Sequence, residues 1–122
     1  MQPSQIEFLR HILDECSYLL HEYSTNTFDD FSNDKRLSKA VCRSLEIIGE
    51  ASNRIHPDIK SKYPIVAWRE MGDIRNRIIH HYFGIDYDIV WDTVKTDIPL
   101  LKEAMETIIQ IEMGNRDNRL NS

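Results

Sequence analysis

The chain has 122 residues, enough for one domain with a real hydrophobic core, and it contains only four glycines and four prolines. Its net charge of −5 argues against a general nucleic-acid coat, which needs a broad basic surface, but leaves room for a local basic cleft. No apolar run approaches the ~20 residues of a membrane span, and the N-terminal residues lack the apolar centre of a signal peptide. We therefore expect a cytoplasmic protein without membrane attachment.

The two cysteines, Cys16 and Cys42, both fall within helical apolar patterns. Their positions favour free, buried thiols in a reducing compartment over a disulfide. No cluster of cysteine and histidine has the spacing of metal ligands, so we expect neither a metal site nor a cofactor.

Apolar residues recur at helical spacing through the first half of the chain. We expect a first helix over residues 4–23 and then a short turn in which Phe28 and Phe31 pack onto the rest of the bundle. A longer second helix begins after Asp34, whose side chain suits a helix N-cap, and runs to about Ile55.

Prolines and glycine divide the second half of the chain. Pro57 ends the second helix because the residue before a proline disfavours the α conformation, and one further turn follows it. A third major helix is predicted over 66–83, with Gly84 as its stop. Asp86 caps a fourth helix, which Pro99 kinks or splits in two.

The pattern as a whole predicts an all-α protein, an antiparallel bundle of four to five helices. Residues 1–113 form the predicted domain, and the polar residues 114–122 a frayed C-terminal tail. A bundle this small often exposes an apolar face, so a homodimer is plausible.

A dense polar cluster lies within the third predicted helix. Three arginines, an amide, two imidazoles and a phenol fall within fourteen residues: Arg69, Arg75, Asn76, Arg77, His80, His81 and Tyr82. Packing does not require that combination, whereas chemistry on a phosphate uses forked arginine donors and a histidine that titrates near neutral pH. We take this cluster as the candidate site.

The geometry of a straight helix leaves one problem open. Arg75 and His80 would point about 140° apart, too far for one shared face. Either the helix ends or deforms near His80, or the long arginine wraps round, or two subunits contribute to one site. Arg75 lies at the border of the apolar stripe, where Glu46 or Glu50 of the second helix could pair with it.

Each member of the cluster also has a structural interpretation. Arg75 alone could be an ion-pair residue, and His80 and His81 could favour the dipole of a helix C-terminus. Tyr82 could be a ring at the edge of the core, and Trp68 and Trp91 are more simply packing anchors than base-stacking residues. What favours a functional role is the combination of these residues, not any one of them alone.

The cluster resembles a known motif. Arg75, four residues, His80, one residue and Tyr82 match the R-x-x-x-x-H-x-Y motif of HepT-like toxins, within the HEPN superfamily of small helical ribonucleases. The similarity spans roughly residues 34–109 and includes three further segments: Leu45-Glu46-Ile47-Ile48-Gly49-Glu50-Ala51, Trp68-Arg69-Glu70-Met71 and Tyr82-Phe83-Gly84-Ile85-Asp86 with Ile89-Val90-Trp91. His81 is a departure, because the family usually carries a small residue there.

The resemblance implies a homodimer whose two motif copies line a shared cleft and cleave RNA without metal. Arg75 and His80 would be catalytic, and Asn76, Arg77 and Arg69 would support them or hold RNA. The implied partner is a minimal nucleotidyltransferase antitoxin of the MNT type, which would neutralise the toxin by transferring AMP onto Tyr82.

Two hypotheses of different kinds remain. The first is a ribonuclease toxin that carries its chemistry on Arg75 and His80. The second is a non-catalytic helical module that binds or regulates a nucleotidyltransferase, which the acidic net charge and His81 motivate. A bare helical dimerisation domain would leave the polar cluster unexplained.

Overall fold

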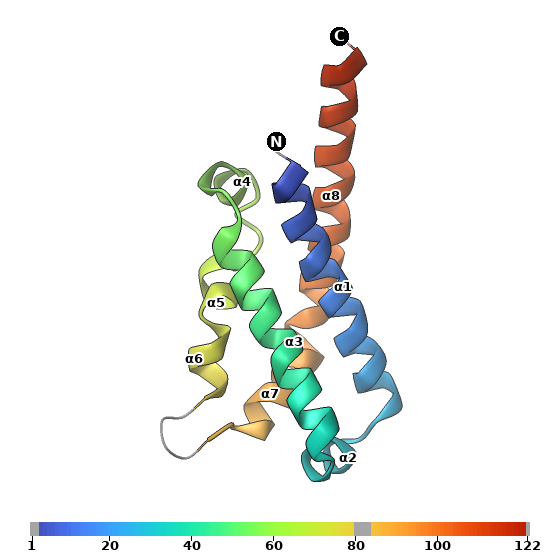
Figure 1. Cartoon of the computed structure of the whole chain (residues 1–122), viewed down its shortest axis with the longest axis vertical. Coiled ribbons are helices and arrows are strands. Elements are labelled where there is room, and N and C mark those ends of the chain that lie inside the picture. The colour runs from blue at the N-terminus through green and yellow to red at the C-terminus, as the bar shows by residue number, and fades with distance from the viewer. Residues whose placement is uncertain (1–2, 80–83, 122) are drawn as a thin grey trace.

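The computed structural model describes the backbone of residues 3–79 and 84–121, with the side chains of 5–79 and 84–115. All regular elements in those residues are helices, so the all-α prediction is confirmed. Figure 1 labels eight: α1 (Pro3–Thr25), α2 (Phe28–Asn33), α3 (Lys35–Arg54), α4 (Pro57–Lys62), α5 (Trp68–Gly72), α6 (Ile74–Ile78), α7 (Tyr87–Thr96) and α8 (Ile98–Asn121).

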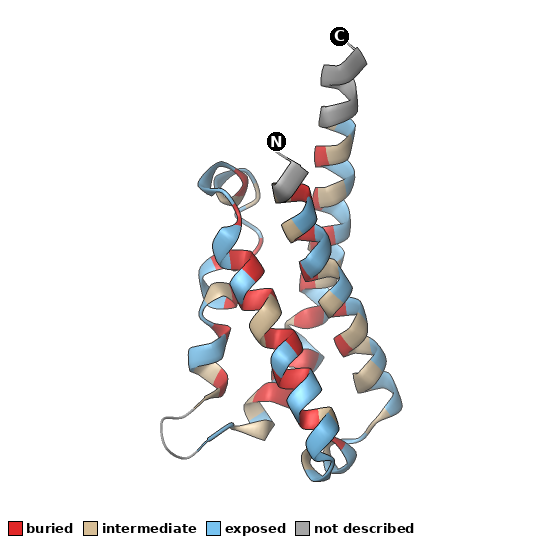
Figure 2. Ribbon diagram, in the orientation of Figure 1, coloured by how far each residue is buried: buried red, intermediate tan, exposed pale blue. Residues whose placement is uncertain are grey.

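The long helices form an antiparallel bundle. α1 runs in one direction and packs against α3 and α8, which both run in the other. Buried residues line the faces that these helices turn toward one another (Figure 2). Fully covered members of this core include Leu9, Ile12 and Leu19 of α1, Val41, Leu45 and Ile48 of α3, and Ile98, Met105 and Ile108 of α8.

The helix boundaries follow local capping signals in the first half of the chain. Asp34 Oδ1 accepts hydrogen bonds from the backbone N–H of Arg36 and Leu37, which confirms it as the N-cap of α3. Upstream, α2 is covered by aromatic contacts, with the ring of Phe31 4.7 Å from Trp91 and 5.4 Å from Tyr87 between centroids. These rings attach α2 to α7, as the sequence predicted for this turn.

The single long third helix predicted over 66–83 is wrong. The chain forms two five-residue helices instead, α5 and α6, separated at Asp73, whose backbone (φ −99°, ψ 11°) leaves the helical region. Glycine is a poor helix former, and the carbonyl of Gly72 accepts a hydrogen bond from Asn53 Nδ2 of α3 at 3.1 Å. That contact with α3 favours a break at this point.

α6 also ends earlier than expected, at Ile78. Ile79 is extended (φ −107°, ψ 120°) and forms an isolated antiparallel bridge with Ile85. The backbone N–H of Asp86 donates to the carbonyl of Ile78 at 2.8 Å. Pairing with residues 85 and 86 therefore replaces the next helical turn.

The last two helices confirm the break predicted near Pro99. Asp86 caps α7 by accepting from the backbone N–H of Ile89, and α7 ends at Thr96. α8 begins at Ile98, so Pro99 lies in its first turn, where a missing N–H is tolerated. The backbone of α8 stays helical to Asn121, into the segment predicted as a tail, and the division into domain and tail stays a prediction.

Other features of the described residues agree with the sequence. Cys16 and Cys42 are free and buried, as predicted. Burial raises the pKa of the Cys16 thiol to about 12 and that of Cys42 to about 11, so both stay protonated and unreactive. Trp68 and Trp91 are buried, as expected of packing anchors. No helix in residues 3–79 and 84–121 has the length and apolar character to cross a bilayer.

Candidate functional site

The candidate site starts on α6, which presents one apolar and one polar face. Ile74 and Ile78 are fully buried and hold α6 against the core. Arg75 and Asn76 are exposed. α6 has only five residues and no side-chain N-cap, so contacts with the rest of the protein, and not helix propensity, hold it in place.

Arg75 forms no ion pair with any residue that the structure describes. Glu46 and Glu50, the partners considered from the sequence, instead lie 3.7 Å and 3.2 Å from Nη1 of Arg43, one turn and two turns along their own helix α3. The guanidinium of Arg75 therefore stays available to an anionic ligand on the described surface of the protein.

The residues on either side of the 80–83 segment contact one another. The Ile79–Ile85 bridge and the hydrogen bond between Asp86 and Ile78 hold residues 78–79 beside residues 85–86. Gly84 lies just before the second anchor and has φ +83°, in the left-handed region that glycine adopts without strain. The predicted residues His80, His81 and Tyr82 lie outside the described residues, so their roles stay predictions.

The end of α6 changes the angular problem. A 140° separation of Arg75 and His80 holds only if one straight helix carries both, and the helix ends at Ile78 with an extended residue after it. Of the three alternatives, the ending of the helix near His80 is therefore confirmed. The other two, a wrapped arginine and a site shared between subunits, stay open.

The supporting residues differ in their contacts. Asn76 donates from Nδ2 to Asp73 Oδ1 at 2.5 Å, which braces the break between α5 and α6 and leaves its amide oxygen available. Arg69 on α5 is exposed and forms no ion pair with a described residue. Both remain candidates for contact with RNA.

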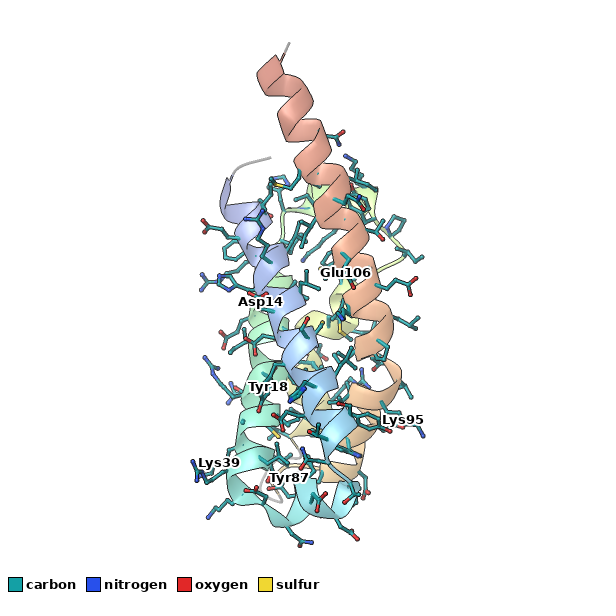
Figure 3. All side chains as sticks on the ribbon, turned by 90° about the vertical axis from the view of Figure 1, so that its right-hand side faces the viewer. Asp14, Tyr18, Lys39, Tyr87, Lys95 and Glu106 are labelled. Atoms are coloured by element: carbon teal, nitrogen blue, oxygen red, sulfur yellow. The ribbon has the colours of Figure 1, made fainter. Side chains whose placement is uncertain are left out.

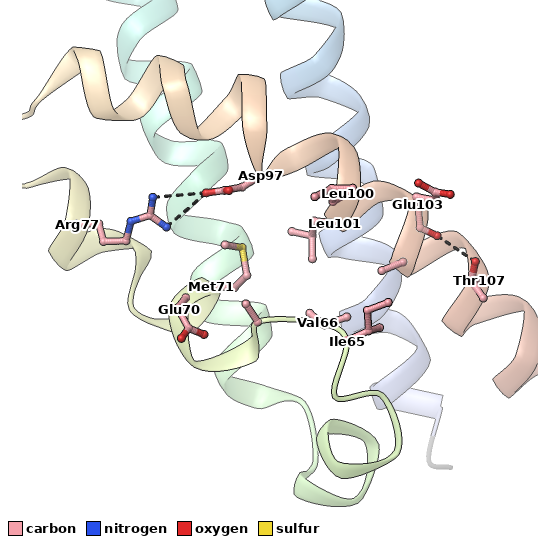
Figure 4. A pocket seen from close by; sticks show the side chains of 12 residues that line it. Ile65, Val66, Glu70, Met71, Arg77, Asp97, Leu100, Leu101, Glu103 and Thr107 are labelled. Carbon is pink, nitrogen blue, oxygen red and sulfur yellow. Dashed lines mark hydrogen bonds and ion pairs between the residues drawn. The ribbon is translucent and has the colours of Figure 1, made fainter.

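Arg77 has a different environment from Arg75. Its Nη1 and Nη2 lie 3.5 Å and 3.4 Å from Asp97 Oδ2, and Nη2 also donates to Thr93 Oγ1 at 3.3 Å. Figure 4 shows this pair at the junction between α7 and α8. Residues two apart on a helix point about 160° apart. Arg75 and Arg77 therefore leave α6 in nearly opposite directions, Arg77 toward α7–α8.

An apolar hollow of about 620 Å³ lies beside Arg77, between the 65–71 segment and the start of α8 (Figure 4). Ile65 and Leu100 on its wall are 86% and 69% exposed. Its polar groups are Glu70, Glu103, Thr107 and the Arg77–Asp97 pair, which include no histidine and no unpaired cation for a phosphate. The candidate site is therefore on the Arg75 face and not in this hollow.

The structure adds a basic surface that the sequence analysis did not single out as a unit. Lys35, Arg36, Lys39 and Arg43 are all exposed on the first half of α3. At 100° per residue they share an arc of about 100°, and no acidic residue occurs between 35 and 45. Figure 3 shows Lys39 projecting from one edge of the bundle. The spacing i, i+4, i+8 of Lys35, Lys39 and Arg43 was the signal in the sequence.

This basic face of α3 is unfavourable for the helix itself. Cations in the first turn oppose the helix dipole, and α3 has no acidic residue in its first turn apart from the capping Asp34 that precedes it. α3 packs directly against α6, which carries Arg75. A cationic surface on a helix that also contacts α6 suits a polyanion better than it suits helix stability.

Comparison with known proteins identifies the family. A family described as "Ribonuclease HepT-like" matches residues 12–108. The chain is 44% identical over 114 residues to "Putative RNase MJ0127" of Methanocaldococcus jannaschii, covering 93% of each chain. It is 44% identical over 109 residues to "Probable ribonuclease HepT" of Thermococcus cleftensis, covering 88% of this chain and 98% of that one.

A third relative extends the similarity to another lineage. "Putative RNase TTE0752" of Caldanaerobacter subterraneus is 40% identical over 105 residues, which cover 86% of this chain and 94% of the relative. No solved structure matches the chain significantly. The family match spans most of the chain and includes the Arg75 motif, and so it confirms the resemblance first drawn from that motif. The chain belongs to the HepT-like ribonucleases of the HEPN superfamily.

Proposed function

We propose that this chain is the toxin of a type VII-like toxin–antitoxin pair, a ribonuclease that cleaves RNA without a metal ion. Its site would form at the cleft of a homodimer from Arg75 and His80. The observation that carries the proposal is the exposed Arg75, which has no ion pair among the described residues. It lies in a HepT-like ribonuclease, just before the Ile79–Ile85 bridge that flanks the rest of the motif.

The proposed chemistry is an internal transfer on the RNA backbone. A base takes the proton of the ribose 2′-hydroxyl, and O2′ attacks phosphorus. The P–O5′ bond breaks, a proton goes to O5′, and the products are a 2′,3′-cyclic phosphate and a 5′-hydroxyl. Histidine is the side chain suited to proton transfer near neutral pH, and His80 acts as the base or as the acid in this step.

Negative charge builds on the non-bridging oxygens as O2′ attacks, and the positive charge of Arg75 stabilises it. Arginine is always protonated, and its fork of donors matches a phosphate. The side-chain amide of Asn76 supports the same phosphate or orients His80, and Arg69 holds a flanking phosphate. Because Arg75 is exposed and has no ion pair among the described residues, while Glu46 and Glu50 pair with Arg43, it reaches the substrate without first breaking such a pair.

The basic face of α3 explains how a chain with a net charge of −5 attracts RNA. Lys35, Arg36 and Lys39 form a cationic surface on the first half of α3, the helix against which α6 packs, whereas Arg43 on the same face is paired with Glu46 and Glu50. Local potential, not the total charge, governs the approach of a polyanion. We assign this face to the RNA backbone that flanks the cleaved bond.

Regulation follows from the motif tyrosine. A partner nucleotidyltransferase of the MNT type transfers AMP onto the hydroxyl of Tyr82, which adds a bulky anion near Arg75. The added phosphate competes with RNA for the same guanidinium and fills the cleft.

The experiment is RNA cleavage by the purified dimer in EDTA, after intact-mass measurement shows that Tyr82 carries no AMP. His80→Ala and Arg75→Ala are the test variants, and Arg54→Ala, an exposed arginine at the far end of α3, is the matched control. We expect both test variants to lose cleavage by at least about 100-fold, with the control unchanged and 2′,3′-cyclic phosphate at the product ends.

A fully active His80→Ala protein would overturn the proposed mechanism. Absence of cleavage by the folded, unmodified wild type, together with tight binding of the nucleotidyltransferase, would favour the non-catalytic binding module. Cleavage by the wild type that EDTA abolishes would contradict the metal-independent step.

A further inference from the structure

Arg77 occupies an acidic neighbourhood, in contrast to Arg75. Besides its contacts to Asp97 and Thr93, it borders a second shallow hollow with Asp88 and Asp92 of α7. Three carboxylates around one guanidinium repel a phosphate from that side of α6. Arg77 is therefore poorly placed to hold RNA, the role that its position in the motif suggests.

The contacts of Arg77 join α6 to the break between α7 and α8. Asp97 is the C-cap of α7, with its N–H donating to the Thr93 carbonyl at 2.9 Å. Thr93 is buried, and its hydroxyl donates to the Ile89 carbonyl at 2.7 Å, which turns a lone pair toward Arg77. The guanidinium of Arg77 thus contacts both Thr93 and Asp97, which are already held together by the last turn of α7.

α6 depends on such outside contacts. It has five residues and no capping side chain, and its next turn is replaced by the bridge at Ile79. Two buried isoleucines fix how deep α6 sits, but apolar contacts are not directional. The hydrogen bonds of Arg77 fix its rotation about its own axis, which sets the direction of Arg75.

We propose that Asp97 and Thr93 are positioning residues of the ribonuclease site, which hold Arg77 and, through it, turn Arg75 toward the substrate. The two arginines thereby divide the work: Arg75 meets phosphate and Arg77 anchors α6. This inference rests on the proposed ribonuclease function.

The variant Asp97→Asn distinguishes two possible roles of Arg77, RNA binding and anchoring of α6, because they predict different changes in RNA affinity and kcat. If Arg77 binds RNA, removing the carboxylate frees the guanidinium, and RNA affinity rises. If Arg77 is an anchor, the same change weakens the anchor, and kcat falls on the order of tenfold while KM changes little. Asp92→Asn removes an equal charge from the same acidic surface without touching a bond to Arg77, and it serves as the matched control.

A double-mutant cycle tests whether Arg77 and Asp97 act together. We expect the double variant to lose no more kcat than Arg77→Gln alone, because Arg77→Gln already removes the contact with Asp97. Arg77→Lys keeps one donor and restores part of kcat. Thr93→Val, which removes the hydroxyl without changing charge, lowers kcat in the same direction. Binding of a short labelled RNA in a His80→Ala background, across a salt series, gives the affinity separately from chemistry.

A readout independent of nuclease activity keeps the two proposals apart. Hydrogen exchange at the amides of residues 74–79 should accelerate in Arg77→Gln and Asp97→Asn, no further in the double variant than in Arg77→Gln, and stay unchanged in Asp92→Asn. If the wild type cleaves no RNA, the proposed function fails, and exchange alone decides whether Arg77 anchors α6. Tighter RNA binding by Asp97→Asn, additive losses in the cycle, or unchanged exchange would each overturn the positioning role.

Discussion

Gly49 of α3 and Ile74 of α6 approach so closely that a Cβ on the glycine would lie 3.1 Å from Ile74 Cγ2. The same Cβ would lie 3.2 Å from the carbonyl oxygen of Met71, a backbone atom that cannot rotate away. Gly49 therefore permits the contact that seats α5 and α6 on α3. Because Gly49 has no side chain, α6 and the Arg75 that it carries can lie close against α3.

Gly49→Ala should destabilise the protein. Overpacking a tight contact costs about 1–3 kcal/mol, whereas the better helix propensity of alanine returns up to about 1 kcal/mol. We expect a net loss of about 1 kcal/mol in the free energy of unfolding, measured by urea denaturation. Gly114→Ala is the control, because no atom lies within 4 Å of its added Cβ, and there alanine should stabilise. Equal stabilisation by both changes would contradict the close contact.

Much of the fold could be predicted because its signals are local. Asp34 caps α3, Pro57 opens α4, and the break near Pro99 separates α7 from α8. Each of these depends on residues within one turn of the boundary. The buried stripes of α1 and α3 likewise follow from spacing along a single helix.

The third helix could not be predicted, because distant residues break it. Asn53, nineteen residues away, donates a hydrogen bond to the carbonyl of Gly72, and the backbone N–H of Asp86 donates one to the carbonyl of Ile78. Helical periodicity runs through Met71, Ile74 and Ile78 and gives no sign of either contact. The partner of Arg77 was hidden for the same reason, since Asp97 lies twenty residues further on in another helix.

Glu112 should make stability depend on pH at the acid side. It is buried on α8 and accepts hydrogen bonds from Lys62 Nζ at 2.7 Å and the Tyr63 hydroxyl at 2.5 Å. Burial alone would raise its pKa, but the hydrogen bonds and the Lys62 charge outweigh burial and lower the pKa of Glu112 below 4.5. A carboxyl with a lowered pKa contributes stability above about pH 4.5, which is lost as pH falls through the lowered value.

We expect Glu112→Gln to reduce the free energy of unfolding at neutral pH by about 1–3 kcal/mol, since it weakens two hydrogen bonds to a buried acceptor. Its stability should also decline less than that of the wild type as pH falls below 4.5. Glu106→Gln, on an exposed face of the same helix, is the control and should leave the acid limb unchanged. Parallel pH profiles for Glu112→Gln and the wild type would exclude this role.

Gly84 should be required for its backbone conformation and not for space. Its φ of +83° lies in the left-handed region, and among the described residues beyond its chain neighbours no atom lies within 4 Å of an added Cβ. Alanine there costs about 1–2 kcal/mol, whereas asparagine tolerates the region better. Thermal unfolding should rank wild type above Gly84→Asn and Gly84→Ala lowest, and RNA cleavage should follow the same order. A lower stability of Gly84→Asn than of Gly84→Ala would mean that side-chain size, not backbone strain, limits this position.

The basic face of α3 should bind RNA through charge alone. Lys39 and Lys95 are both exposed lysines, and Figure 3 shows them on opposite edges of the bundle, Lys39 on α3 and Lys95 on α7. If Lys39 neutralises one phosphate, Lys39→Ala should weaken binding of a short single-stranded RNA and reduce the slope of log K against log salt concentration by about 0.7. Lys95→Ala removes the same charge from the other edge, so it should leave that slope unchanged. Fluorescence anisotropy of the labelled RNA across a salt series measures both, in a His80→Ala background that prevents cleavage. Equal losses from the two variants would show that only net charge matters, and the RNA path along α3 would then be wrong.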